Sequence, residues 1–207
     1  MAQQSITKDC INWTKLSPKP NYPATIGGVF SWLVILADWQ IRGLAMEGLL
    51  VDPFDGSLVN PASLDVRLGP NLMVEARHTD KLLTVSIKQS SEHDPFLLEP
   101  GQFVLGETVE TLNIPSYLKL CAQFALKSSR AREGIEHLMS GYVDPGFHAS
   151  KLTLELLNAR KLRPVRLWHG MKIGQLVFHR MEEAPLVGYE KTGHYNGIDR
   201  VAPSWES

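Results

Sequence analysis

The fold is decided by alternation in short apolar stretches, most clearly in Leu152-Thr153-Leu154-Glu155-Leu156-Leu157-Asn158. Successive side chains of a β-strand point to opposite faces, so the first three leucines share one face and Glu155 lies on the other. A carboxylate therefore stands inside an apolar strand. We expect either a glutamate with a raised pKa that serves proton transfer, or a glutamate on the solvent face of an edge strand.

Similar short apolar stretches occur along most of the chain. Turn residues separate them at Pro100-Gly101, Pro145-Gly146 and His169-Gly170. Many short strands with regular turns predict an all-β sandwich or barrel, because alternating strands and helices would need long helical patterns between the strands. The predicted strands cover residues 64–68, 83–87, 103–105, 118–124, 152–156 and 173–178.

Helical patterns are few. Asp38 is expected to cap a helix that ends near Gly48, with apolar residues at three- and four-residue spacing on one face. A second, short helix is predicted over residues 129–136.

The domain organisation follows from composition along the chain. Residues 1–34 contain Pro18, Pro20 and Pro23 and are predicted to form an N-terminal extension or arm. Residues 35–207 are predicted to form a single domain. Its last part, residues 183–207, is rich in Gly, Pro and polar residues and is expected either to be a disordered end or to close over a ligand as a lid.

Composition excludes several classes of protein. The chain has 207 residues and a formal net charge of −1, so it has no broad electrostatic attraction for nucleic acid or for an anionic membrane. It contains no apolar run long enough to cross a bilayer and no signal-peptide pattern at its start. With Cys10 and Cys121 as its two cysteines, a disulfide framework is not expected. We therefore expect a cytoplasmic protein.

The densest group of chemical side chains begins at Lys127-Ser128-Ser129-Arg130-Ala131-Arg132. Serines at the start of a short helix after a strand present hydroxyl and N–H groups to an anion, and the basic residues add charge. A capped turn with solvated charges is the alternative. Farther on, Asp144-Pro145-Gly146 is ordinary turn chemistry when considered alone.

A zinc-dependent nucleotide deaminase is excluded by its missing motifs. Such an enzyme needs an H-x-E segment and a P-C-x-x-C segment. None of the seven histidines is followed two places later by Glu, and two distant cysteines cannot supply the second segment.

In their order, several motifs between about residues 37 and 204 resemble those of the dCTP deaminases, which belong with the trimeric dUTP pyrophosphatases. The motifs are Asp38-Trp39-Gln40-Ile41, residues 60–69, residues 98–106 with Thr108 and Glu110, Ile114-Pro115, Ser128-Ser129-x-Ala131-Arg132-x-Gly134, Asp144-Pro145-Gly146-Phe147, Leu154-Glu155 with Asn158, and residues 170–176.

This resemblance implies a distorted jelly-roll β-barrel of the dUTPase-like type, assembled as a homotrimer with active sites at subunit interfaces. It also implies metal-independent hydrolysis at C4 of the cytosine of a deoxycytidine nucleotide. Glu155 matches the general base, Ser128 the hydroxyl that places the water, and Arg132 the group that holds the catalytic carboxylate.

The same resemblance implies how the substrate is bound. Asp144 would contact the deoxyribose 3′-hydroxyl, with Phe147 beside the sugar. Mg²⁺ would accompany the nucleotide phosphates and not activate the water. The other expected substrate-binding residues are Lys127, Ser129, Ser140, Tyr189, His194 and Tyr195.

The phosphate end departs from the family pattern. Lys127 stands where the family usually has an arginine, and His194-Tyr195 replaces a Lys-Tyr pair without the glutamine that normally follows. We therefore hypothesise that dCMP or dCDP is used alongside or instead of dCTP. Two alternatives remain: a dUTP pyrophosphatase or a bifunctional enzyme that converts dCTP to dUMP, and a non-catalytic nucleotide sensor with the same pocket.

Overall fold

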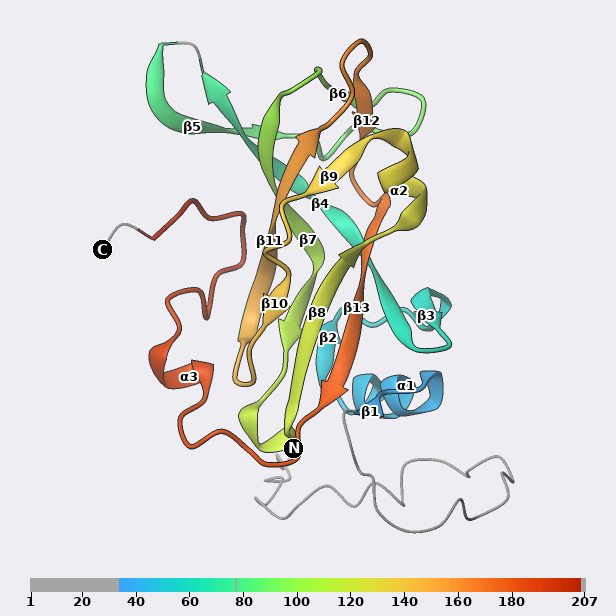
Figure 1. Ribbon diagram of the computed structural model, residues 1–207, viewed down its shortest axis with the longest axis vertical. Coiled ribbons are helices and arrows are strands. Elements are labelled where there is room, and N and C mark those ends of the chain that lie inside the picture. Colours follow the sequence, from blue (N-terminus) through green and yellow to red (C-terminus); the bar gives the residue numbers. More distant parts are fainter. Residues whose placement is uncertain (1–33, 77, 206–207) are drawn as a thin grey trace.

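The computed structural model describes residues 34–76 and 78–205, and most of them lie in a strongly curled antiparallel β-sheet (Figure 1). Within this part of the chain, the main sheet has 11 strands, and a separate pair joins β12 to β6. The predicted all-β fold class is confirmed. The long strands are β4 (Ser63–Ala76), β7 (Phe103–Asn113), β8 (Leu120–Leu126), β11 (His148–Asn158) and β13 (Lys172–Arg180).

The path through the main sheet runs β10-β8-β13-β4-β7-β11-β9, so strands distant in sequence lie side by side. The other strands of this sheet are β1 (Val34–Ile35), β2 (Leu50–Asp52), β3 (Val59–Asn60), β5 (Thr79–Ser86), β9 (Ile135–His137) and β10 (Tyr142–Val143). The separate pair consists of β6 (Phe96–Leu98) and β12 (Val165–Leu167). Two 3₁₀ turns occur at Gly56–Leu58 and Ser116–Leu118.

The core lies inside the curl of the sheet and consists mainly of leucine side chains with Phe178 among the largest. On β11, Leu152, Leu154 and Leu156 are buried, as their alternation predicts. The start of β4 differs from the expected pattern, because residues 63–66 are buried on both faces of the strand. On β5 the alternation does not lead to burial, since Leu83 is half exposed.

The predicted first helix is α1 (Asp38–Met46), which buries Ile41, Leu44 and Ala45 against the sheet. Its capping was predicted incorrectly. Asp38 is the first helical residue, and the cap is Ala37, whose backbone N–H donates to Gln40 Oε1 at 3.0 Å. The Gln40 side chain thus accepts the hydrogen bond of the backbone N–H at the cap residue, and the alanine side chain contributes none.

The second helix, α2 (Ser128–Glu133), is shorter than the predicted 129–136. Gly134 adopts a left-handed conformation with φ of 98° and ends it. The chain then enters β9, which pairs with β11. An achiral residue at this position is what allows the sharp exit.

The C-terminal part contains the short helix α3 (Tyr189–Thr192) and follows one side of the molecule next to β11 (Figure 1). The prediction for residues 1–34 falls almost entirely outside the described residues, as does Cys10. Among the residues described, no helix combines the length and apolar character that a membrane crossing requires.

Candidate active site

A cavity of about 600 Å³ opens between β11, β10 and the C-terminal segment. Its walls are mainly apolar, and a small set of polar groups converges on it, which is typical of a small-molecule site. The polar side chains that line it are Ser140, Tyr142, Asp144, Lys151, Thr153, Glu155, Tyr189, Tyr195 and Ser204.

Glu155 lies on the cavity face of β11, opposite the buried leucines, with 29% of its side chain exposed. The edge-strand alternative is wrong, because β11 pairs with β7 on one side and with β9 on the other. The Ser140 hydroxyl donates a hydrogen bond to Glu155 Oε2. Glu155 is therefore a carboxylate held in place at the wall of a cavity, and water can still reach it.

His137 lies beside this carboxylate, with Nε2 at 3.4 Å from Glu155 Oε2. Burial lowers the pKa of His137, and the nearby carboxylates of Glu155 and Glu136 oppose this shift without overcoming it. The ring also packs against Phe124 at a centroid distance of 4.6 Å. A neutral imidazole next to Glu155 leaves the carboxylate without a compensating positive charge from this side.

Two tyrosines in the cavity keep their protons. The hydrogen bond with Cys121, together with burial, raises the pKa of Tyr142 to about 12. Burial raises the pKa of Tyr189 as well. Both phenols are therefore neutral hydrogen-bonding groups across the physiological pH range.

The Asp144-Pro145-Gly146 turn brings Asp144 and Phe147 to the cavity and anchors the C-terminal segment. The backbone N–H of Tyr189 donates to Pro145 O at 2.8 Å, and the rings of Phe147 and Tyr189 lie 5.6 Å apart. A side chain at Gly146 would collide with Tyr189 N, which a Cβ would approach to 2.7 Å. The glycine is thus required for the close approach of α3.

Asn196 fixes the rest of the C-terminal segment near the cavity. Its side chain donates to Gly146 O and Tyr189 O, each at 3.2 Å, and accepts from His148 N at 2.9 Å. Tyr195 lines the cavity, and its hydroxyl accepts from Trp205 N at 2.8 Å. His194 does not line the cavity; it stacks on Trp205 at 4.9 Å.

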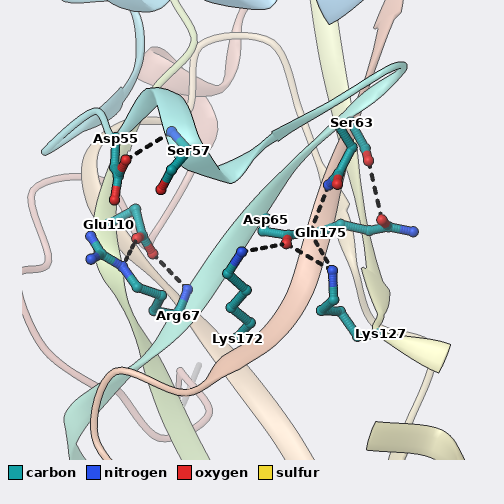
Figure 2. A network of polar contacts seen from close by, with 10 residues as sticks. Asp55, Ser57, Ser63, Asp65, Arg67, Glu110, Lys127, Lys172 and Gln175 are labelled. Carbon is teal, nitrogen blue, oxygen red and sulfur yellow. Dashed lines mark hydrogen bonds and ion pairs between the residues drawn. The ribbon is translucent and has the colours of Figure 1, made fainter. Parts of the chain in front are cut away.

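The residues of α2 lie elsewhere. Ser128, Ser129 and Arg132 are exposed and do not line the cavity, and within residues 34–76 and 78–205 Arg132 forms no ion pair. Lys127, at the start of α2, points away to Asp65 on β4 (Figure 2). In Figure 1, α2 and α3 lie on opposite sides of the molecule. Ser128 and Arg132 therefore do not join Glu155 in the lining of the cavity.

A family model described as dCTP deaminase-like matches residues 35–181, which is more than half of the chain. The chain belongs to the dCTP deaminase-like family. The resemblance found in its motifs is thereby confirmed.

Several relatives of this dCTP deaminase-like chain are named "dCTP deaminase, dUMP-forming". One from Methanoregula boonei is 42% identical over 159 residues, which cover 73% of this chain and 85% of the relative. One from Rhodococcus erythropolis is 39% identical, over 83% of this chain and 95% of the relative. One from Mycobacterium marinum is 38% identical with the same coverage of both chains.

A solved structure supports the fold. The 2′-deoxycytidine 5′-triphosphate deaminase from Agrobacterium tumefaciens superimposes with a TM-score of 0.58 at 24% identity. The match covers 72% of this chain and 48% of that chain, so it spans about half the length of the solved structure. This similarity concerns the β architecture of the dCTP deaminase-like domain.

Among the described residues, no group of three His, Cys, Asp or Glu side chains is placed to hold a metal ion.

Sequence reasoning missed two residues of this dCTP deaminase-like site, His137 and Asn196. Both act across long separations in the chain, His137 on Glu155 and Asn196 on Gly146. The alternation around His137 was a usable signal, because it places the ring on the buried face of a short strand. Asn196 gave no signal beyond its position in a turn-forming segment.

Proposed function

We propose that this protein hydrolyses the C4 amino group of dCTP and releases dUMP, ammonia and diphosphate. Membership of the dCTP deaminase-like family and relatives named as dUMP-forming dCTP deaminases support the reaction. The observation that carries it is the Glu155 carboxylate, bound by Ser140 at the wall of a cavity of nucleoside size. The missing zinc motifs favour a mechanism that uses side chains alone to activate water.

In the first step, Glu155 accepts a proton from a water molecule whose oxygen attacks C4 of the cytosine. The same carboxyl group then delivers this proton to N3 of the ring. The proton of the new C4 hydroxyl passes to the amino group, which leaves as ammonia while the C4 carbonyl forms. Ser140 supports this role because its hydrogen bond fixes one carboxylate oxygen and leaves the other available. In the second step, another water attacks the α-phosphorus, and diphosphate leaves with its Mg²⁺.

The active enzyme is proposed to be a homotrimer in which α2 of a neighbouring subunit completes each cavity. Ser128 would place the attacking water, and Arg132 would hold the Glu155 carboxylate by a charge-assisted hydrogen bond. Two observations support this assignment: both residues are exposed on α2, and neither lines the cavity of its own chain. A shared site would give the exposed Arg132 its partner.

The sugar end of the cavity is proposed to select deoxyribose. Asp144 would accept a hydrogen bond from the 3′-hydroxyl, and the Phe147 and Tyr189 rings would form the adjoining wall. A ribose 2′-hydroxyl pressed against this apolar wall would lose its hydrogen bonds to water, and such a loss disfavours binding.

The phosphate end is proposed to be less selective, so that dCDP and dCMP are deaminated alongside dCTP. Ser129 and Tyr195 remain candidate phosphate contacts, whereas His194 is engaged by Trp205. The C-terminal segment is proposed to act as the lid over the bound nucleotide. A cytoplasmic location stays a prediction from the sequence.

The test is product analysis after incubation of the protein with dCTP, dCDP or dCMP and Mg²⁺. Formation of dUMP and ammonia from dCTP is the expected result. Accumulation of dUTP would show that the protein deaminates without cleaving phosphate. Binding of all three nucleotides with no ammonia released would contradict the enzyme and favour a nucleotide sensor. Turnover of dCTP alone would sink the proposed use of dCDP and dCMP.

A further inference from the structure

Asp65 is a buried carboxylate outside the cavity, at the centre of the polar network in Figure 2. It lies on β4 with 2% of its surface exposed. Lys127 Nζ approaches both of its oxygens at 2.7 Å. Asn60 donates to Oδ1 at 2.7 Å, and Lys172 Nζ lies 3.5 Å from Oδ2. The carboxylate is therefore bound on several sides by groups from β3, α2 and β13.

Lys127 connects this network to α2. It is the N-cap residue of the helix, and its backbone carbonyl accepts from Arg130 N at 2.9 Å and Ala131 N at 3.0 Å. Its own N–H donates to Ile173 O on β13 at 3.1 Å. The side chain and the backbone of one residue thus fasten the start of α2 to β4 and β13. The next residue along the chain is Ser128.

The ammonium of Lys127 is poorly placed to leave Asp65 for a substrate phosphate. It carries three donors, and two hydrogen bonds to one carboxylate already occupy it. Moving it away would leave a buried negative charge with Asn60 and the more distant Lys172 as its partners, and a buried charge that loses its ion-pair partner is strongly destabilising. A solvated phosphate has to displace this pair before it can bind Lys127.

We infer that Lys127 and Asp65 are positioning residues: their ion pair sets the orientation of α2, and Lys127 is not a direct phosphate ligand. This inference deepens the proposed function and rests on it, since α2 carries the residues that complete the deaminase site. It also explains why a lysine serves at this position, because a point charge suffices for a buried carboxylate that other groups already orient.

The experiment measures kcat and KM of Asp65→Asn, Lys127→Met and the double variant with dCTP, dCDP and dCMP. Displaced catalytic groups lower kcat, so kcat/KM should fall on the order of 10- to 100-fold. The fall should be the same for all three nucleotides, with the double variant no worse than the poorer single variant. Lys127→Arg, which can still pair with Asp65, should recover most of kcat. Lys119→Met, at an ion pair on the surface, is the control and should match wild type.

A direct phosphate contact gives a different pattern. Lys127→Met would then raise KM for dCTP far more than for dCMP, and Asp65→Asn would leave dCTP turnover near the wild-type value. Either result overturns the inference.

Unfolding in urea provides a readout that does not depend on turnover. If the pair acts as a unit, the double variant is more stable than the sum of the two single losses predicts. Additive losses would overturn the inference even if a variant is inactive. If the wild-type protein shows no turnover, the proposed function is wrong. The urea measurement would still decide whether the Lys127 and Asp65 side chains are coupled.

Discussion

The candidate site residues fall into two groups, one in the cavity on β11 and one at the turn that begins α2. The first group lines a cavity, whereas the second is exposed on the surface of the chain. The cavity is lined by residues of its own chain, since Tyr189 and Tyr195 of the C-terminal segment line it together with Glu155. At the start of α2, Lys127 forms an ion pair with Asp65 of β4, whereas the side chains of Ser128 and Arg132 are exposed. One group of residues thus lines a cavity and the other group faces outward, which is the arrangement that the proposed trimer requires.

The largest effect is expected at the cavity, from Glu155→Gln. Loss of the general base should reduce kcat for ammonia release by about 10²- to 10⁴-fold while nucleotide affinity changes little. Stopped assays of ammonia and calorimetric titration with dCTP measure the two quantities. Glu136→Gln, at an exposed carboxylate on the neighbouring β9, is the matched control and should behave as wild type. Normal turnover by Glu155→Gln would exclude this residue as the base.

At the α2 turn, Arg132→Ala should lower kcat/KM by about 10²-fold without changing the melting temperature. Activity should fall while the melting temperature stays the same, because the Arg132 side chain is exposed and supports no packing in its own chain. Thermal unfolding and steady-state kinetics are the measurements, with Arg163→Ala, at another exposed arginine, as the control. If the enzyme loses stability as well as activity, Arg132 supports the packing of its own chain and its role is not confined to the active site.

Glu107→Gln tests whether Glu107 holds the C-terminal segment against the cavity. Glu107 is fully buried and accepts from Asn71 Nδ2 at 2.9 Å and from Val201 N of the C-terminal segment, with Lys151 Nζ at 3.6 Å. In the glutamine variant, an NH₂ group would replace one carboxylate oxygen and face groups that are themselves hydrogen-bond donors. The free energy of unfolding should therefore fall by about 1–3 kcal/mol. Proteolysis should also cut the C-terminal segment faster. The surface substitution Glu183→Gln should change neither property.

The smallest effect is expected from the pH dependence at His137. Because burial lowers the pKa of this ring, the unfolded chain binds the proton more readily than the folded one. Stability is then lost as pH falls through the ordinary histidine value of 6.5, and it is regained as pH rises. In His137→Phe, the loss of unfolding free energy between about pH 7.5 and about pH 5.5 should be smaller than in wild type. An equal loss in both proteins would show that the ring is not penalised by burial.

Patterns confined to a few neighbouring residues predicted the fold well. Alternation in residues 152–158 placed Glu155 opposite the buried leucines, and the three-four spacing after Asp38 located α1. These features follow from strand and helix geometry alone. The end of α2 was missed because Gly134 stops the helix by its backbone conformation, which outweighs the helix propensity of the residues around it.

Features that depend on distant contacts were not predictable. No residue near Asp65 in the sequence indicates that both faces of β4 are covered, since its partners Lys127 and Lys172 come from the start of α2 and from β13. The order of Ser128, Arg132 and Glu155 in the family motif identified candidates, but it carries no information on whether one chain assembles them. Ser128 and Arg132 do not line the cavity that contains Glu155, and their roles stay predictions.

A subunit-mixing experiment tests most directly whether the cavity and the α2 turn form one site. Glu155→Gln and Arg132→Ala are each purified, then mixed under conditions that exchange subunits, and dCTP deamination is measured against the separate variants. If α2 of one subunit completes the cavity of another, random mixed trimers contain intact sites, and activity should recover to about a quarter of wild type. A mixture with no more activity than its separate components, under proven subunit exchange, would contradict the account.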